Sequence, residues 1–329
     1  MTMRTVRSVC VLGVLALAAS GVQTAPARAG DDPHHPRAAP QPARKVDHPT
    51  FDALVGSWNA STKGMRGESA GVAQFGKAAD GTALVWEIER KGSESTFYGL
   101  GVLRFSGAGD AVRLWWFDTM GVADVTVFHG AVTAEGWDLG SEVGFAMRLR
   151  KAATGWVLTL GQGETTYSTT TYTKAEKPAA FTSPSAPKEG LLAAAIGDWT
   201  VAGAYTMPGS DGKPATVKGT GTARWRWSLG GAALVEDYDV MVGSAKTASV
   251  LVLRPAADAK TCKAWGFVAD TVEPTVLAGP VEGDTWTGTG AMPGGGELTV
   301  KWSRKGEQHQ VEALSGAQVV GTDTFTRKR

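Results

Sequence analysis

The chain contains an internal duplication, and this duplication limits the folds that it can adopt. Five short anchors occur twice in the same order, at offsets of 141, 150, 152, 149 and 153 residues. The anchors and their second copies are LVGSW (54–58) and AIGDW (195–199), GTALV (81–85) and GAALV (231–235), Asp118 and Asp270, EGW (135–137) and GDTW (283–286), and TYTK (171–174) and TFTR (324–327). Self-similarity at a long fixed spacing indicates that the same structural unit is built twice. We therefore expect two similar domains in tandem.

Each half is dominated by segments typical of β-strands. The segment ALVWEIER (83–90) alternates apolar and polar residues, and ARWRWSL (223–229) does so in the second half. The chain has 43 glycines, which disfavour long helices and suit the turns between short strands. Only FDALV (51–55) and EGLLAAAIG (189–197) have the composition of short helices. Roughly eight to ten strands per half with short connections predict an all-β fold, an antiparallel up-and-down barrel in each half.

The first 29 residues have the features of a secretory signal peptide. Arg4 and Arg7 precede a short apolar segment, and Ala27-Arg28-Ala29 forms an A-x-A cleavage site. This apolar segment is too short and wrongly flanked for a stable membrane anchor, and no other run in the chain could span a bilayer. We therefore expect cleavage after Ala29 and a protein that is exported to the periplasm or the extracellular space.

Composition sets the remaining boundaries. We expect a disordered leader over 30–49, domains over 50–174 and 189–329, and a Pro- and Ala-rich linker over 175–188. Removal of the signal peptide removes Cys10 and leaves Cys262 as the remaining cysteine, so no intramolecular disulfide can form. A net charge of +1 gives no electrostatic reason to expect nucleic acid or an anionic membrane as a partner. The sequence does not predict an oligomeric state.

The anchors resemble a known fold family. A short helical turn, a G-x-W motif, many antiparallel strands and a basic residue on the last strand resemble the calycin superfamily of lipocalins and their relatives. The pattern LVGSW…GGxxLV…D…TFTR is more closely similar to the secreted bacterial family called domain of unknown function 1579, here in two copies. This resemblance implies two tandem calycin-like β-barrels. The family implies no activity.

The same resemblance implies that one end of each barrel is closed by a tryptophan and a cation. In lipocalins a basic residue of the last strand packs across the indole, a contact that contributes about 0.5–2 kcal/mol. The equivalent pairs here are Trp58 with Lys174 and Trp199 with Arg327. We expect these four residues to be structural, and Lys174 departs from the arginine that stacks better.

The function that this fold suggests is non-enzymatic binding of a small apolar or amphipathic ligand, because barrels of eight to ten strands can enclose one such molecule. The candidate ligand-binding residues are the aromatics predicted to face inward, namely Trp86, Trp116, Trp225, Trp227, Tyr238 and Trp265. Two alternatives stay open. The barrels could be filled and act as a structural or interaction module, or barrel carboxylates could serve a hydrolase or an isomerase.

The segment GESAG (67–71) matches the G-x-S-x-G nucleophile elbow of serine esterases. The elbow requires a buried strand before the motif and a helix after it. Here a mostly polar segment precedes Gly67, a Gly-rich segment follows Gly71, and Ser69 aligns with Gly219 in the second half. We therefore predict a strand at this position and no catalytic serine.

Other polar residues give weaker signals. Glu87 and Glu89, like Asp237 and Asp239, are expected on a solvated outer strand face. One calycin branch binds haem through a histidine, and His129 is the weak candidate for such a ligand, whereas His309 is expected in a loop. The His, Cys and carboxylate residues lack the grouped spacing of a metal centre. We therefore expect no catalytic residues, no metal and no cofactor.

Overall fold

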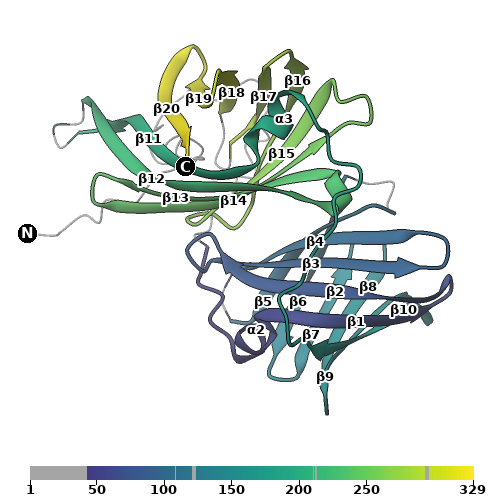
Figure 1. Ribbon diagram of the computed structural model, residues 1–329. Coiled ribbons are helices and arrows are strands. Elements are labelled where there is room, and N and C mark those ends of the chain that lie inside the picture. Colours follow the sequence, from purple (N-terminus) through teal and green to yellow (C-terminus); the bar gives the residue numbers. More distant parts are fainter. Residues whose placement is uncertain (1–42, 108, 121–123, 210, 212, 293–295) are drawn as a thin grey trace, which may run out of the picture. The chain divides into compact units, whose positions relative to one another are not determined.

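The computed structural model (Figure 1) describes residues 43–107, 109–120, 124–209, 211, 213–292 and 296–329. The predicted signal peptide, residues 1–29, lies outside the described residues, as does the leader up to residue 42. The described chain forms two closed antiparallel barrels of ten strands each, here called barrel 1 and barrel 2. The predicted all-β fold with two tandem barrels is therefore confirmed.

Barrel 1 is preceded by the short helix α2 (Pro49–Leu54). Its strands are β1 (Gly56–Gly64), β2 (Gly67–Ala78), β3 (Ala83–Gly92), β4 (Thr96–Phe105), β5 (Ala111–Asp118), β6 (Thr126–Thr133), β7 (Gly136–Ser141), β8 (Phe145–Ala152), β9 (Gly155–Gln162) and β10 (Thr165–Lys174). Each strand pairs with the next along the chain, and β10 pairs with β1 to close the ring. This is the up-and-down order that short connections require.

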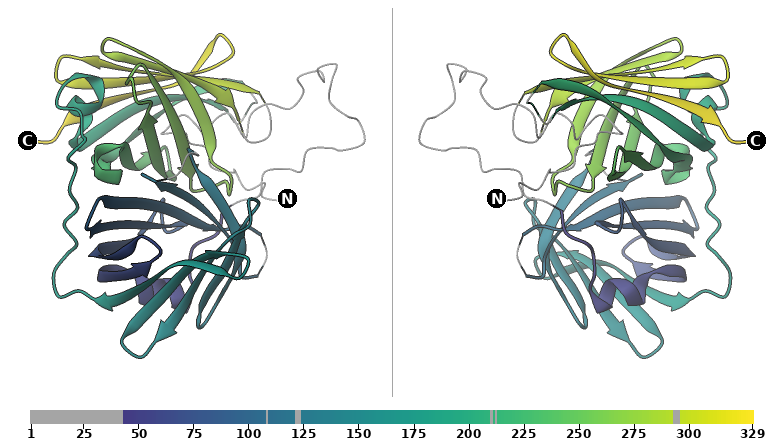
Figure 2. Two further views of the ribbon diagram at one scale, coloured as in Figure 1. Left: turned by 90° about the vertical axis from the view of Figure 1, so that its right-hand side faces the viewer. Right: turned by 90° about the vertical axis from the view of Figure 1, so that its left-hand side faces the viewer.

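Barrel 2 repeats this order after helix α3 (Gly190–Ala195). Its strands are β11 (Gly197–Pro208), β12 (Pro214–Ser228), β13 (Ala233–Val242), β14 (Ala245–Pro255), β15 (Thr261–Val268), β16 (Thr275–Glu282), β17 (Thr285–Ala291), β18 (Glu297–Lys305), β19 (Gln308–Ser315) and β20 (Gln318–Arg327), with a 3₁₀ turn η1 (Leu229–Gly231) before β13. Figure 2 shows the strands of each barrel from two further sides. Neither helix in the described residues is long and apolar enough to cross a membrane.

The duplication extends to the strand register at the seam of each barrel. Trp58 on β1 pairs with Lys174 on β10, and Trp199 on β11 pairs with Arg327 on β20. The Lys174 ammonium lies 4.5 Å from the Trp58 ring centroid, and the Arg327 guanidinium lies 4.7 Å from that of Trp199. The structure thus brings together both of the Trp–cation pairs that the sequence motifs matched.

The tryptophan and the cation of each pair also donate hydrogen bonds to carbonyl groups at the C-terminal end of the short helix. The indole Nε1 of Trp58 donates to the Leu54 carbonyl at 2.7 Å, and Lys174 Nζ donates to the Val55 carbonyl at 3.0 Å. Neither helix has a basic residue in its own last turn, so the cation from the last strand interacts with this end of the helix dipole.

Barrel 2 uses a larger set of bonds for the same closure. The two Nη atoms of Arg327 donate to the carbonyls of Ile196 and Ala194 at 2.9 and 2.8 Å. Trp199 Nε1 donates to the Ala195 carbonyl at 2.7 Å. A guanidinium can hold two carbonyls in a fixed geometry, whereas the ammonium of Lys174 in barrel 1 bonds only one described carbonyl, that of Val55.

The glycine that ends GESAG has a steric role that is repeated in both halves. A Cβ atom on Gly71 would lie 1.9 Å from the carbonyl oxygen of Glu89 on the next strand. A Cβ atom on Gly221 would lie 2.1 Å from the equivalent oxygen of Asp239. Only glycine permits so close an approach between adjacent strands. The duplicated glycine therefore marks a contact between the second and third strands of each barrel.

The boundaries of the ordered chain differ from the composition-based expectation. Val46, predicted in the disordered leader, is fully buried, and its amide donates to the Gly81 carbonyl at 2.7 Å. The predicted linker also binds barrel 1, because the Thr182 amide and hydroxyl both donate to the Glu89 carboxylate, at 2.6 and 3.0 Å. Composition identified polar, Pro-rich segments, but their side chains and amides find partners on the barrel wall.

Candidate functional site

The interior of barrel 1 is filled with aromatic side chains toward the end closed by α2. Trp86 stacks on Phe75, with 5.4 Å between centroids, and its ring lies 4.6 Å from that of Trp116. Trp137 lies 6.3 Å from Trp86 and 6.4 Å from Phe51 of α2. Aromatic pairs at these separations add to the stability from buried area. This half of the barrel interior is closely packed. Its rings of Phe75, Trp86, Trp116 and Trp137 are here called the aromatic floor.

Beyond this floor, one arginine of the described residues enters the interior of barrel 1. Arg90 follows Trp86 and Ile88 on the inward face of β3, since alternate residues of a strand share a face. Its Nη1 donates to the hydroxyls of Thr62 and Thr170 at 2.6 and 3.2 Å. The guanidinium also lies 4.4 Å from the centroid of Phe97. The arginine is therefore held by neutral groups on three other strands.

Arg90 has no acidic partner in the described part of the chain, and its buried Nε has no hydrogen-bond acceptor there. Burial lowers the pKa of Arg90, because a low-dielectric site disfavours the charged form. Two further buried donors, the Tyr172 hydroxyl and Trp86 Nε1, also have no partner among the described residues. Native proteins satisfy nearly all buried polar groups. This interior therefore presents a set of donors that suits an acceptor or an anion.

At the positions equivalent to Thr62, Arg90 and Thr170, barrel 2 has an acidic residue and no cation. Four residues in from its Trp–cation pair, barrel 2 has Gly203 paired with Asp323, where barrel 1 pairs Thr62 with Thr170. Val240 takes the place of Arg90. It lies opposite Gly221 on the neighbouring strand, as Arg90 lies opposite Gly71. The two barrels thus share the same strand framework and differ in the chemistry of their interiors.

Asp323 is 1 % exposed and is held by two tyrosines. The Tyr205 hydroxyl donates to one carboxylate oxygen and the Tyr238 hydroxyl to the other, the latter at 3.2 Å. The two hydroxyls lie 3.1 Å apart. Burial raises the pKa of Asp323 to about 7, while the two tyrosine hydrogen bonds act in the opposite direction. A carboxyl group with such a pKa changes its charge near neutrality.

A second buried carboxyl group lies near Asp323. Glu236 is 0 % exposed, and neither of its carboxylate oxygens has a hydrogen-bond partner among the described residues. It shares the inward face of β13 with Tyr238. Burial raises the pKa of Glu236 well above its ordinary value, and the charges of Asp323 and Asp237 raise it further. Perturbed carboxyl groups of this kind are characteristic of functional sites.

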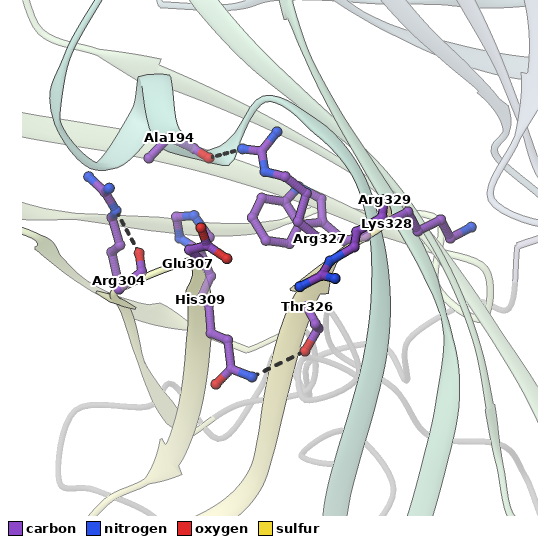
Figure 3. A pocket seen from close by; sticks show the side chains of 11 residues that line it. Ala194, Arg304, Glu307, His309, Thr326, Arg327, Lys328 and Arg329 are labelled. Atoms are coloured by element: carbon purple, nitrogen blue, oxygen red, sulfur yellow. Dashed lines mark hydrogen bonds between the residues drawn. The ribbon is translucent and has the colours of Figure 1, made fainter.

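A pocket of about 540 Å³ opens at the closed end of barrel 2 (Figure 3). It is lined by Ala194, Trp199, Arg304, Gly306, Glu307, Gln308, His309, Thr326, Arg327, Lys328 and Arg329. The Arg327 and Arg304 side chains that line it donate to the backbone carbonyls of Ala194 and Gly306. These bonds give both side chains a structural role in the wall of the pocket.

His309, expected in a loop, is instead a buried residue of β19 in this wall. Trp302 Nε1 donates to its Nδ1 at 3.1 Å, and Trp199 meets its ring edge to face at 4.9 Å. Burial lowers the pKa of His309, although a hydrogen bond with the Ala194 backbone opposes this. The loop prediction was wrong because the tryptophans on either side cover a residue whose sequence neighbours are polar.

Most of the aromatic residues predicted to line a ligand site do face a barrel interior. Trp86 and Trp116 lie together in barrel 1, and Tyr238 lies in barrel 2. Trp225 stacks on Trp302 near the closed end, with 5.0 Å between centroids. Trp227 is half-buried, and no ring contact involving it is described.

Trp265 does not face the interior, contrary to the sequence analysis. It pairs with Val252 and Val276, whereas the inward residues of β15 are its neighbours Ala264 and Gly266. Lys263 covers its ring from outside at 5.2 Å. Both faces of β15 are apolar, so alternation alone could not identify the inward one.

His129, the weak haem candidate, faces away from the barrel 1 interior. Phe128 beside it points inward, and Arg113 Nε donates to His129 Nδ1 at 3.1 Å. Burial and Arg113 lower the pKa of His129. Across the described residues, no group of three or more His, Cys, Asp or Glu side chains could hold a metal ion.

GESAG forms the first part of strand β2, where Ser69 pairs with Thr62 and Gly92. No strand-to-helix turn follows it, because β2 continues to Ala78.

The carboxylates expected on the outer strand face differ in their exposure to solvent. Asp239 is exposed and pairs with Lys246 at 2.9 Å, but Glu87 is 6 % exposed.

Arg90, Glu236 and Asp323 were not among the residues expected to face a barrel interior. Arg90 continues the inward series Leu84, Trp86, Ile88, and Glu236 lies between Leu234 and Tyr238 in the corresponding series of β13. The alternation that placed the aromatics inside therefore also placed these charges inside. The signal was present, but polar residues of a strand were assigned to the outer face.

Comparisons with known proteins add little to this geometry. No protein-family model matches the chain. No curated protein matches it. Among solved structures, it is similar to a protein of unknown function from the DUF3598 family of Nostoc punctiforme, at 12% sequence identity and a TM-score of 0.20 over 87% of this chain and 100% of that chain. A likeness at this level assigns no activity to the chain.

Proposed function

We propose that the protein is an exported binding protein and that barrel 1 takes up a small amphipathic ligand with an anionic head group. The observation that carries this proposal is Arg90, a buried cation without an acidic partner in the described chain. Burying an unpaired ion costs on the order of several kcal/mol. A ligand that brings a negative charge offsets that cost, so the site favours an anion.

The geometry of Arg90 favours a planar acid group. Its hydrogen bonds to Thr62 and Thr170 both use Nη1, which leaves the Nε–Nη2 edge for a ligand. A carboxylate can accept two parallel hydrogen bonds from that edge. The Tyr172 hydroxyl and the aromatic floor at Trp86 and Trp116 lie on the same interior face, where they would contact the head group and the apolar part of the ligand.

Two broader assignments accompany this proposal. Membership of the calycin superfamily, close to the domain of unknown function 1579 family, is supported by the Trp–cation pair at the closed end of each barrel. Export to the periplasm or the extracellular space is supported by the signal-peptide features of residues 1–29. An amino-terminal sequence of the protein purified from its own cells, beginning at Gly30, would test the export proposal.

The experiment is titration of the purified chain with straight-chain carboxylates from hexanoate to dodecanoate and with the matching alcohols. Binding is followed by fluorescence, because Trp86 and Trp116 line the site. We expect carboxylates to bind more tightly than alcohols. Arg90→Met should weaken carboxylate binding by about 10- to 100-fold, the equivalent of a charged hydrogen bond, and leave alcohol binding unchanged.

Arg148→Met is the matched control, because Arg148 is an exposed arginine of the outer wall beside Asp138. It should bind every probe as the wild type does. Equal affinity of wild type and Arg90→Met for carboxylates would refute the role of Arg90. The absence of saturable binding for every probe would instead favour filled barrels and a structural module, which the aromatic floor of barrel 1 supports.

A further inference from the structure

Glu236 is a buried carboxyl group inside barrel 2, and the ligand proposed for barrel 1 does not involve it. Both of its carboxylate oxygens are inaccessible to solvent and have no hydrogen-bond partner within the described residues. Burying the polar atoms of even a neutral carboxyl group without hydrogen-bond partners is unfavourable. Its two oxygens therefore point to a group that enters the barrel and donates hydrogen bonds.

The residues around Glu236 form a defined polar site. Asp323 lies close enough to raise its pKa, and Tyr205 and Tyr238 fix the Asp323 carboxylate. Gly203 makes room for this arrangement, since a Cβ atom there would lie 2.2 Å from the Tyr205 hydroxyl and 2.3 Å from Asp323 Oδ1. A glycine at this position allows the tyrosine and the aspartate to meet inside the barrel.

Hydroxyl groups complete the polar surface on the adjacent strands. Ser249 on β14 pairs with Tyr238, and Thr275 on β16 pairs with Gly266, so both hydroxyls lie on the interior face. Neither hydroxyl has a partner among the residues that the structure describes. A hydroxyl oxygen can accept a hydrogen bond from a ligand, so both add acceptors to those of Glu236.

The charge of this interior is acidic. The charges of Asp323 on β20 and of Asp237 beside it both raise the pKa of Glu236, and the nearby Tyr205 and Tyr238 contribute hydroxyl groups. Arg304 and His309 face the interior from β18 and β19, toward the end closed by α3, and neither contributes to the pKa of Glu236. Tyr238 and Phe325, with centroids 6.5 Å apart, offer aromatic faces that attract cations.

We propose that the interior of barrel 2 is a second binding site, for a small organic cation whose ammonium group is held between Glu236 and Asp323. An alkylammonium group carries three N–H donors and a positive charge. The donors match the unpartnered oxygens of Glu236, Ser249 and Thr275, and the charge matches the two acids. This site is independent of the one in barrel 1 and has the opposite charge preference.

Binding is coupled to proton release. In the ligand-free protein, burial and the charge of Asp323 raise the pKa of Glu236 and so favour its protonated form. An ammonium group stabilises the carboxylate, so Glu236 loses its proton to the buffer while the ligand keeps all of its own protons. Affinity for the cation should therefore rise with pH until Glu236 ionises in the ligand-free protein.

The test is calorimetric titration of the full chain with hexylammonium chloride at pH 7, in phosphate and in MOPS buffer, which differ in heat of ionisation and carry no primary ammonium group. The heat difference between the buffers reports protons released. We expect saturable binding with net release of protons, because the ammonium group favours the ionised forms of Glu236 and Asp323, both of which have a raised pKa. Hexanol should not bind at this site, and hexanoate should bind only through Arg90. Glu236→Gln, which keeps the shape of the neutral side chain, should lower hexylammonium affinity at least about ten-fold and reduce the number of protons released.

Two variants serve as controls. Asp239→Asn removes an exposed carboxylate from the outer face of the same strand and should change nothing. Arg90→Met should also leave hexylammonium binding unchanged, which separates this site from the one in barrel 1. If Glu236→Gln fails to fold, Asp323→Asn tests the same pair of acids and should also weaken binding.

Three results would each overturn the proposal. The first is no saturable hexylammonium binding by the wild type. The second is equal affinity for hexylammonium in Glu236→Gln, or in Asp323→Asn where that variant replaces it. The third is hexanol binding that matches hexylammonium and depends equally on Glu236, which would indicate a neutral polar site.

Discussion

The raised pKa of Asp323 predicts that barrel 2 loses stability as the pH rises from acid to neutral. The ordinary pKa of an aspartate is 3.8, and burial raises it to about 7 in the folded protein. Between these values the folded state keeps a proton that the unfolded state has lost. Unfolding then releases a proton, so raising the pH favours the unfolded state. This contribution is fully present below pH 4 and is lost as the pH passes through 7.

The size of the effect follows from the shift. One pKa unit corresponds to about 1.36 kcal/mol, so a shift of roughly three units is about 4 kcal/mol. Glu236 acts in the same direction, because its pKa is raised as well. The wild-type slope therefore contains both groups, and only the difference from a variant isolates Asp323. In Asp323→Asn the amide has no such proton, so the contribution of position 323 becomes independent of pH.

The assay is urea denaturation of wild type and Asp323→Asn at intervals from pH 4 to pH 8, followed by tryptophan fluorescence and far-UV circular dichroism. We expect the free energy of unfolding of the variant to gain about 4 kcal/mol on the wild type across this range. Asp239→Asn, on the exposed face, should track the wild type. A constant difference between wild type and Asp323→Asn at all pH values would refute the reasoning.

Two further predictions concern the frame of the barrels. Gly71→Ala should destabilise barrel 1 by about 1–3 kcal/mol, because the new Cβ would lie 1.9 Å from the Glu89 carbonyl oxygen and the strands must separate. Gly76→Ala, on the same strand with no described atom within 4 Å, should be close to neutral in the same thermal melt. Trp199→Ala should lower the stability of barrel 2 by about 3–5 kcal/mol and leave carboxylate binding in barrel 1 intact, and an unchanged unfolding temperature would contradict its role in closing the barrel.

Much of the fold could be predicted from the sequence because it depends on local and repeated patterns. The duplicated G-x-W motifs and terminal cations gave the number of domains, and alternation gave strands. The short helices were expected at 51–55 and 189–197 and occur at Pro49–Leu54 and Gly190–Ala195. Val46 and Thr182, in the segments assigned to the leader and the linker, are ordered by hydrogen bonds to residues far away in the sequence, which composition does not record.

The candidate sites were less predictable, because they depend on which side chains meet when each ring closes. Arg90 bonds Thr62 and Thr170, which lie on other strands, 28 and 80 residues away in the sequence. Asp323 meets Tyr205 across 118 residues. No local spacing records these distances.

Hydrophobic alternation and sequence duplication are properties of the chain itself, and they determined that it forms two similar barrels; the resemblance to lipocalins implied that a tryptophan and a cation close each one. Only the tertiary structure decided which groups surround the positive charge inside barrel 1 and the two acids inside barrel 2. The physical reason is that the energetic cost of a charged side chain depends on its burial and its partners. Both are fixed only when the first and last strands of a barrel come together.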